Sequence, residues 1–90
     1  MDRRLDWARA LLADGHAHDA CTLLHEAVQS CPEWIAGWIE LGRIALEAQD
    51  FDLARQALNT ALSLDPLDHF GAGVYLDRLR QVPLRQNLPI

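Results

Sequence analysis

Apolar residues recur at every third or fourth position through most of this chain, which is the spacing expected of helices that bury one face. The pattern is interrupted at Gly15, Pro32, the Gln49-Asp50 pair, the Asp65-Pro66 pair and Pro83. No stretch alternates apolar and polar residues in the manner of a strand. The sequence therefore predicts an all-α fold. The predicted helices cover residues 2–14, 18–30, 33–48, 51–64 and 67–82, followed by an irregular tail over 83–90.

A longer repetition is superimposed on the helical pattern. Identical residues lie 34 positions apart in several places, among them Arg9 and Arg43, Ala20 and Ala54, Leu24 and Leu58, Ala27 and Ala61, Pro32 and Pro66. At the same spacing, Gly15 is matched by a bend at Gln49-Asp50. A period of this length is typical of helix pairs stacked as a solenoid. We expect one domain over residues 1–82, with a first repeat over 1–34, a second over 35–68 and a closing helix over 67–82.

The repeated residues suit close packing of paired helices. Small side chains at Ala20, Ala27, Ala54 and Ala61 let two helices approach, and Gly42 has the same effect on the third helix. The space that remains is filled by larger apolar residues, which are Leu24, Trp38, Leu41 and Leu58. The two internal prolines end the second and fourth helices, because proline has no amide donor and disfavours a helical residue before it.

The second repeat resembles the tetratricopeptide repeat family. The resemblance rests on Trp38-x-x-Leu41-Gly42-x-x-Ala45, then Ala54-x-x-x-Leu58-x-x-Ala61, then Pro66. The first repeat has Arg4, Trp7 and Ala8 where the second has Trp38, Leu41 and Gly42. This departure indicates a terminal repeat whose outer face is adapted to solvent.

The resemblance implies a protein-protein interaction module with a concave groove lined by the first helix of each pair. In this frame the groove residues are Leu5, Arg9, Leu12, Ile39, Arg43, Leu46 and Asp77. They predict binding of an apolar peptide or helix of a partner, with Arg9 and Arg43 fixing its orientation through forked hydrogen bonds. The alternative is that these arginines pair with Asp6, Glu40, Glu47 or Asp77 on a solvated face. Some relatives grip a C-terminal carboxylate with a Lys and Asn clamp, whose aligned positions here are Leu5, Arg9, Glu40, Phe70 and Val74, so we do not expect that ligand.

Composition narrows the partner classes. The net charge of −5 argues against nucleic acid and an anionic membrane as partners. The first residues lack the apolar core of a signal peptide, and no apolar run has the length of a membrane span. Cys21 and Cys31 lie ten positions apart on one predicted helix, too far for a disulfide. Free thiols fit a reducing compartment, so we predict a cytoplasmic protein.

The sequence offers little catalytic or cofactor chemistry. Its serines, Ser30 and Ser63, both lie near predicted helix ends beside prolines, and we predict no enzymatic activity and no cofactor. His18, Cys21 and His25 share one helical face and carry ligand types that zinc accepts. The repeat frame aligns them with Asp52, Arg55 and Asn59, which favours a solvated surface over a metal site.

A second resemblance concerns residues 65–72. This segment is similar to the one that follows the repeats in bacterial methyltransferases with an N-terminal tetratricopeptide region. The alternative function is therefore a regulatory or substrate-recruiting module of a larger enzyme, although no glycine-rich cofactor loop is present. Two repeats are fewer than the three usually needed for stability. We accordingly expect association, either as a homo-oligomer or with a covalently following domain.

Overall fold

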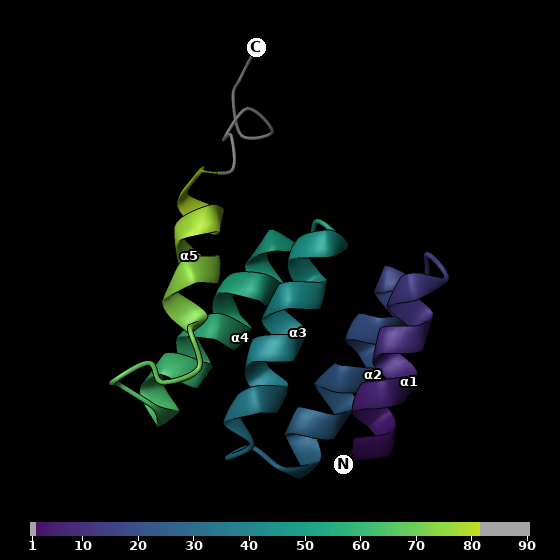
Figure 1. The fold of residues 1–90 in the computed structure, drawn as a ribbon, viewed down its shortest axis with the longest axis horizontal. Helices are drawn as coiled ribbons and strands as arrows, with labels where there is room; N and C mark the ends of the chain where they lie inside the picture. The colour runs from purple at the N-terminus through teal and green to yellow at the C-terminus, as the bar shows by residue number, and fades with distance from the viewer. Residues whose placement is uncertain (1, 82–90) are drawn as a thin grey trace.

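The computed structural model describes residues 2–81 of the 90-residue chain, with side chains from Leu5 onward. These residues form α1 (Asp2–Ala13), α2 (Ala17–Ser30), α3 (Ile35–Glu47), α4 (Phe51–Leu64) and α5 (Ala72–Gln81), and no strand. Successive helices pack against one another, and α3 also contacts α5. Figure 1 shows α1, α3 and α5 in one layer with α2 and α4 in a second layer behind it, which confirms the predicted all-α solenoid. The tail predicted over 83–90 lies outside the described residues.

The turns inside the two repeats have the same backbone structure. Gly15 and Gln49 both adopt left-handed conformations, with φ of 85° and 63°. The next amide then reaches back five residues: His16 donates to the carbonyl of Leu11 at 2.7 Å, and Asp50 donates to that of Ala45 at 2.9 Å. This arrangement satisfies carbonyls that the helix end leaves open. It confirms the sequence match between Gly15 and the Gln49-Asp50 bend.

The proline stop signals are also confirmed. α2 ends at Ser30 and α4 at Leu64, in each case two residues before a proline. The capping residues Cys31 and Asp65 still donate backbone hydrogen bonds to Ala27 and Ala61, at 3.1 and 2.9 Å. Cys31 therefore caps α2 and lies just outside it, although we expected both cysteines on one helix. Cys21 and Cys31 are both free thiols.

The fifth helix begins at Ala72, so the predicted start at Leu67 is wrong. Asp68 and Gly71 have φ of 55° and 82°, which no continuous helix accommodates. The Asp68 carboxylate accepts hydrogen bonds from the amides of Ala72 and Gly73, at 2.6 and 2.9 Å, and so caps the helix from outside. Short acidic side chains compete in this way for amides that a helix would otherwise use.

The third helix begins at Ile35 rather than at Glu33, because Trp34 closes a turn by donating its amide to the carbonyl of Cys31 at 3.0 Å. The indole of Trp38 donates to the carbonyl of Pro32 at 2.6 Å. Trp38 is partly buried against the core. The structural role predicted for Trp38 is therefore confirmed, and it includes fixing the turn that joins the repeats.

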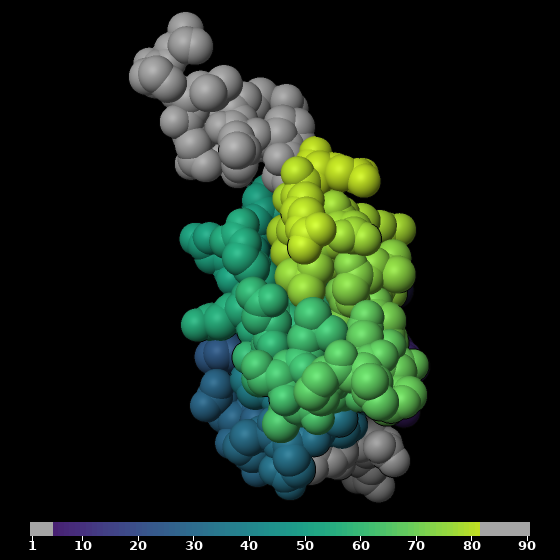
Figure 2. All heavy atoms as spheres, turned by 90° about the vertical axis from the view of Figure 1, so that its left-hand side faces the viewer, coloured from purple at the N-terminus to yellow at the C-terminus, as the bar shows by residue number. Residues whose placement is uncertain are grey.

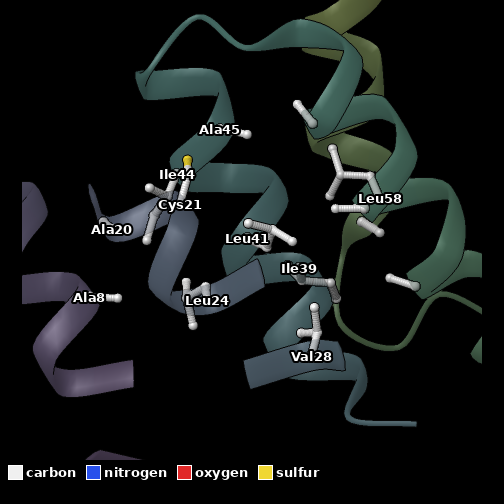
Figure 3. Close-up of a cluster of buried hydrophobic side chains, with 14 of the residues drawn as sticks. Ala8, Ala20, Cys21, Leu24, Val28, Ile39, Leu41, Ile44, Ala45 and Leu58 are labelled. Carbon is white, nitrogen blue, oxygen red and sulfur yellow. The ribbon is translucent and has the colours of Figure 1, made fainter. Parts of the chain in front are cut away.

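The core includes the alanines and leucines that were identified above as repeated in the sequence. Figure 3 shows part of this core, with labelled side chains that come from α1, α2, α3 and α4. The repeated alanines and leucines are buried, and Leu24, Leu41, Ile44 and Leu58 are the largest side chains that are fully enclosed. A Cβ atom at Gly42 would lie 2.5 Å from Cγ of Leu58, so the close approach predicted at Gly42 is confirmed.

Candidate partner-binding groove

Side chains from α1, α3 and the start of α5 surround an open groove of about 250 Å³. Its lining consists of Leu5, Arg9, Ala36, Ile39, Glu40, Phe70 and Tyr75, and we call it the central groove. The layer formed by α1, α3 and α5 brings these residues together although they come from distant parts of the sequence (Figure 1). Three predicted binding residues, Leu5, Arg9 and Ile39, belong to this lining.

The other four predicted residues lie outside the lining. Leu12 and Leu46 are only partly exposed, and both pack against the core. Arg43 bonds to Glu40 at the edge of the groove. Asp77 is exposed and pairs with Arg80 on its own helix at 3.3 Å. Of the predicted charged residues, Arg9 and Arg43 therefore meet at Glu40, whereas Asp77 lies apart from them on α5.

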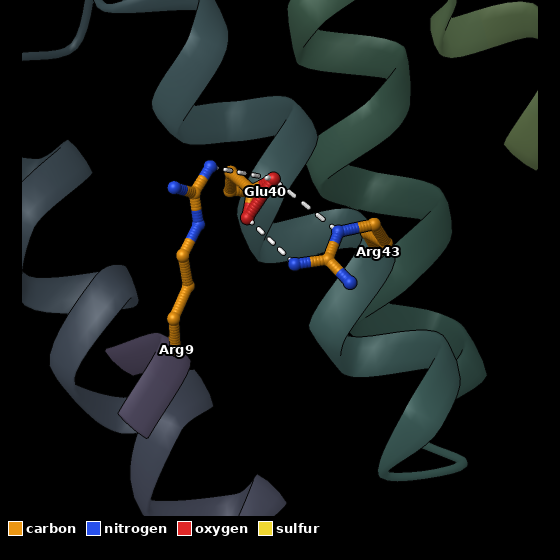
Figure 4. Close-up of polar contacts among 3 residues, drawn as sticks. All are labelled: Arg9, Glu40 and Arg43. Carbon is orange, nitrogen blue, oxygen red and sulfur yellow. Dashed lines mark hydrogen bonds and ion pairs between the residues drawn. The ribbon is translucent and has the colours of Figure 1, made fainter. Parts of the chain in front are cut away.

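Glu40 joins the two repeats electrostatically, as Figure 4 shows. Arg43 donates to both oxygens of the Glu40 carboxylate, at 2.8 Å to Oε2 and 3.3 Å to Oε1. Arg9 reaches across from α1 to within 3.6 Å of Oε1. The side chain of Arg9 is 55% exposed, compared with 29% for Arg43 and 15% for Glu40. Glu40 is one of the acidic residues considered above as pairing partners of Arg9 and Arg43, and both arginines pair with it.

The protonation of this cluster follows from its contacts. Burial alone would raise the pKa of Glu40, but the hydrogen bond and charge of Arg43, together with Arg9, outweigh burial and lower that pKa below its ordinary value. The hydrogen bond to Glu40 raises the pKa of Arg43 in turn. Glu40 and Arg43 are therefore both charged at neutral pH. The guanidinium groups of Arg9 and Arg43 both face the one carboxylate of Glu40 at the edge of the groove.

Two aromatic residues complete the apolar wall. Phe70 is exposed in the segment before α5, and Tyr75 lies partly buried in the helix, with the guanidinium of Arg78 at 5.7 Å from its ring centre. Neither was predicted to bind a partner. The repeat frame contained a signal for Phe70, because it lies 34 positions after Ala36, another lining residue. Tyr75 occupies the position of the buried Leu41, so the frame alone favoured a core role for it.

The histidine and cysteine residues of α2 line a different hollow, of about 390 Å³, beside Asp50 and Leu53. Both His18 and His25 are exposed, as predicted, but Cys21 is buried in the core rather than solvated. Burial, together with the charge of Asp50, raises the pKa of the Cys21 thiol to about 11. Cys21 is therefore protonated at neutral pH. Among the described residues no group of three His, Cys, Asp or Glu side chains is placed to hold a metal ion.

None of the described helices combines the length and apolar character needed to cross a membrane.

Comparison with known families agrees with the repeat frame. Two models described as tetratricopeptide repeat match the sequence, one over residues 35–68 and the other over residues 2–44. The first match has the same bounds as the predicted second repeat, and the other runs from α1 into α3. No curated protein gives a significant match. The similarity of residues 65–72 to methyltransferase-linked repeats stays a prediction.

Proposed function

This chain is a tetratricopeptide repeat protein, and from that premise we propose that its central groove binds a segment of a partner protein. Tetratricopeptide repeats are in general protein-protein interaction modules, and stacked repeats present extended surfaces for this purpose. The role that we propose is binding, without catalysis and without a cofactor. The observation that carries it is the combination, in one groove, of an apolar lining that includes the exposed ring of Phe70 and an arginine, Arg9, whose side chain is 55% exposed.

The apolar walls favour a partner segment with a bulky apolar side chain. Leu5 and Ile39 lie on the first helices of the two repeats, and the exposed ring of Phe70 stands at the third wall. Ile39 is buried at 8% exposure and Leu5 is partly exposed, whereas Phe70 is 53% exposed, so an inserted side chain would cover apolar surface mainly on Phe70 and Leu5. Each square ångström of apolar surface removed from water contributes about 25 cal/mol. Such an anchor accounts for affinity better than polar contacts at the rim.

Arg9 adds a preference for an anionic or carbonyl group next to that anchor. Its contact with Glu40 is longer than that of Arg43, at 3.6 Å against 2.8 Å, and its side chain is more exposed. Arg9 can therefore turn towards a ligand while Arg43 keeps the carboxylate of Glu40 in place. A guanidinium group binds a carboxylate through two parallel hydrogen bonds, which fixes orientation as well as affinity. We assign Arg43 to positioning Glu40, and Arg9 to contact with the partner.

Selection from a random peptide display library tests this proposal. We expect the selected peptides to share a bulky apolar residue with an acidic residue nearby. Titration calorimetry with one selected peptide should then show that Phe70→Ala and Arg9→Glu each weaken binding by about tenfold or more, as expected for loss of a central contact. Arg9→Lys should be intermediate, because lysine keeps the charge but loses the fork.

Leu67→Ala is the matched control for the apolar wall. Leu67 is, like Phe70, a strongly exposed apolar side chain, but it does not line the groove. Its replacement should leave the affinity of the peptide unchanged. Equal affinities for the wild-type chain, Phe70→Ala and Arg9→Glu would contradict the proposal.

A further inference from the structure

The helix row has an exposed tryptophan at one end. Trp7 lies on α1 and is 60% exposed. In Figure 1, α1 lies at the opposite end of the molecule from α5. The equivalent of Trp7 in the second repeat, 34 positions later, is Leu41, which is fully buried. Leu41 lies on α3, which packs against the preceding helix α2, whereas no helix precedes α1 among the described residues. Trp7 therefore occupies the position that, in the second repeat, is buried where the preceding helix packs.

The opposite end of the row carries an open hollow of about 410 Å³ between α4 and α5. It is lined by Arg55, Asn59, Leu76, Leu79 and Arg80, and we call it the end hollow. Figure 2 faces this end of the molecule, with α5 in yellow. Leu79 is buried and Leu76 partly buried, so they form an apolar floor, while the two arginines are exposed.

The arginines of the end hollow are available for a new contact. Arg55 pairs with Asp52 at 3.1 Å and Arg80 with Asp77 at 3.3 Å, in both cases along a single helix and in solvent. Exposed pairs of this kind contribute little and exchange partners readily. The hollow thus offers an apolar floor with two guanidinium groups at its rim.

The chemistry of Trp7 matches that of the end hollow. Indole is the aromatic ring that attracts a guanidinium group most strongly. The indole N–H can donate a hydrogen bond to the side-chain oxygen of Asn59. Two exposed carboxylates lie at the same end of the molecule as Trp7: Asp6 precedes it on α1, and Asp14 follows the last residue of that helix. Their negative charge is complementary to the positive charge of Arg55 and Arg80.

We infer that the end hollow receives Trp7 from a second copy of this chain, so that copies associate head to tail. The two complementary surfaces lie at opposite ends of one molecule, and stacking of copies covers both. A foreign helix in the end hollow would leave Trp7 exposed. The contact joins different patches on the two copies, and it can therefore continue beyond a dimer. This association does not use the central groove and is independent of the proposed peptide binding.

Sedimentation velocity of the full chain over a concentration series tests the inference. The wild-type chain should form species larger than a dimer as concentration rises. Trp7→Ala should weaken association by about 30-fold or more, the effect expected for an aromatic hot spot. The double variant Arg55→Glu/Arg80→Glu should also sediment as a monomer. Leu67→Ala, which removes an exposed apolar side chain outside both surfaces, should associate like the wild-type chain.

Mixing the two defective variants is the decisive step. The Trp7→Ala copy retains its end hollow and the arginine variant retains its Trp7, so the mixture should form a heterodimer that does not grow further. A wild-type chain that stays monomeric, or a mixture that fails to associate, would overturn the inference. Helical circular dichroism checks that both variants fold. Peptide affinity of Trp7→Ala, which should equal that of the wild-type chain, separates failure of this inference from failure of the proposed function.

Discussion

At the residue scale, one backbone conformation is occupied by two different residues. Gly15 and Gln49 end α1 and α3 with the same left-handed turn and the same pattern of amide hydrogen bonds. Glycine adopts this conformation without strain, whereas any residue with a Cβ atom is strained by about 1 kcal/mol. The sequence comparison could identify the equivalence of the two positions, because the spacing is conserved between the repeats of this chain.

The exchange of these residues gives a paired prediction. Gln49→Gly should raise the free energy of unfolding by about 0.5–1 kcal/mol, and Gly15→Gln should lower it by a similar amount. No atom lies within 4 Å of a Cβ built on Gly15, so the second change introduces strain without a clash. Urea unfolding measures both. Shifts of the same sign would show that the turn conformation does not control stability at these positions.

Glu40 supports a second prediction at this scale. Its pKa is lower in the folded chain than its ordinary value of 4.5, so its stabilising contribution is complete above that value and is lost as pH falls through the folded pKa. Glu40→Gln should lower the free energy of unfolding by about 1–2 kcal/mol near neutral pH, since Arg9 and Arg43 lose a charged partner. The difference between the variant and the wild-type chain should shrink as the pH falls below 4.5 and through the lowered pKa of Glu40. Thermal unfolding across this range measures it, and a difference that is constant with pH would contradict the assignment.

At the element scale, the sequence predicted helices better than it predicted their boundaries. Pro32 and Pro66 fix the ends of α2 and α4, because the effect of proline on the preceding backbone is local. The start of α5 was missed because it depends on hydrogen bonds that amides four and five residues further on donate to the Asp68 carboxylate. The 34-residue frame places Leu5, Arg9 and Ile39, and it relates Phe70 to Ala36, but it aligns Tyr75 with a core residue and so did not predict Tyr75 in the groove.

The contact between α3 and α4 gives the prediction at this scale. Gly42→Ala should improve helix propensity by about 1 kcal/mol, but the new methyl group would meet Leu58, which is fully buried and has no room to move. We expect a net loss of about 1–2 kcal/mol in the free energy of unfolding. In a Leu58→Ala background, which removes Cγ and both δ carbons, the clash is relieved and the same change should cost less. An equal cost in both backgrounds would mean that close packing against Leu58 is not the reason for glycine at this position.

At the scale of the whole molecule, the repeat row has two kinds of surface. The central groove lies along one layer and combines residues from both repeats with the segment before α5. Trp7 and the end hollow lie at the two ends of the row. The described residues hold two complete repeats and bury less core than longer arrays, so the proposed contacts at the ends would add to stability as well as to assembly. Because the two proposed surfaces are separate, the proposals predict that partner binding and self-association are compatible on one molecule.

The most direct test of the central claim is the map of amide chemical shifts in the isotopically labelled chain as a display-selected peptide is added. Binding in the central groove predicts that the largest shift changes cluster around Leu5, Arg9, Ile39, Glu40 and Phe70, with little change on the outer faces of α2 and α4. Changes that cluster on those outer faces or around the end hollow, with the groove unaffected, would contradict the account.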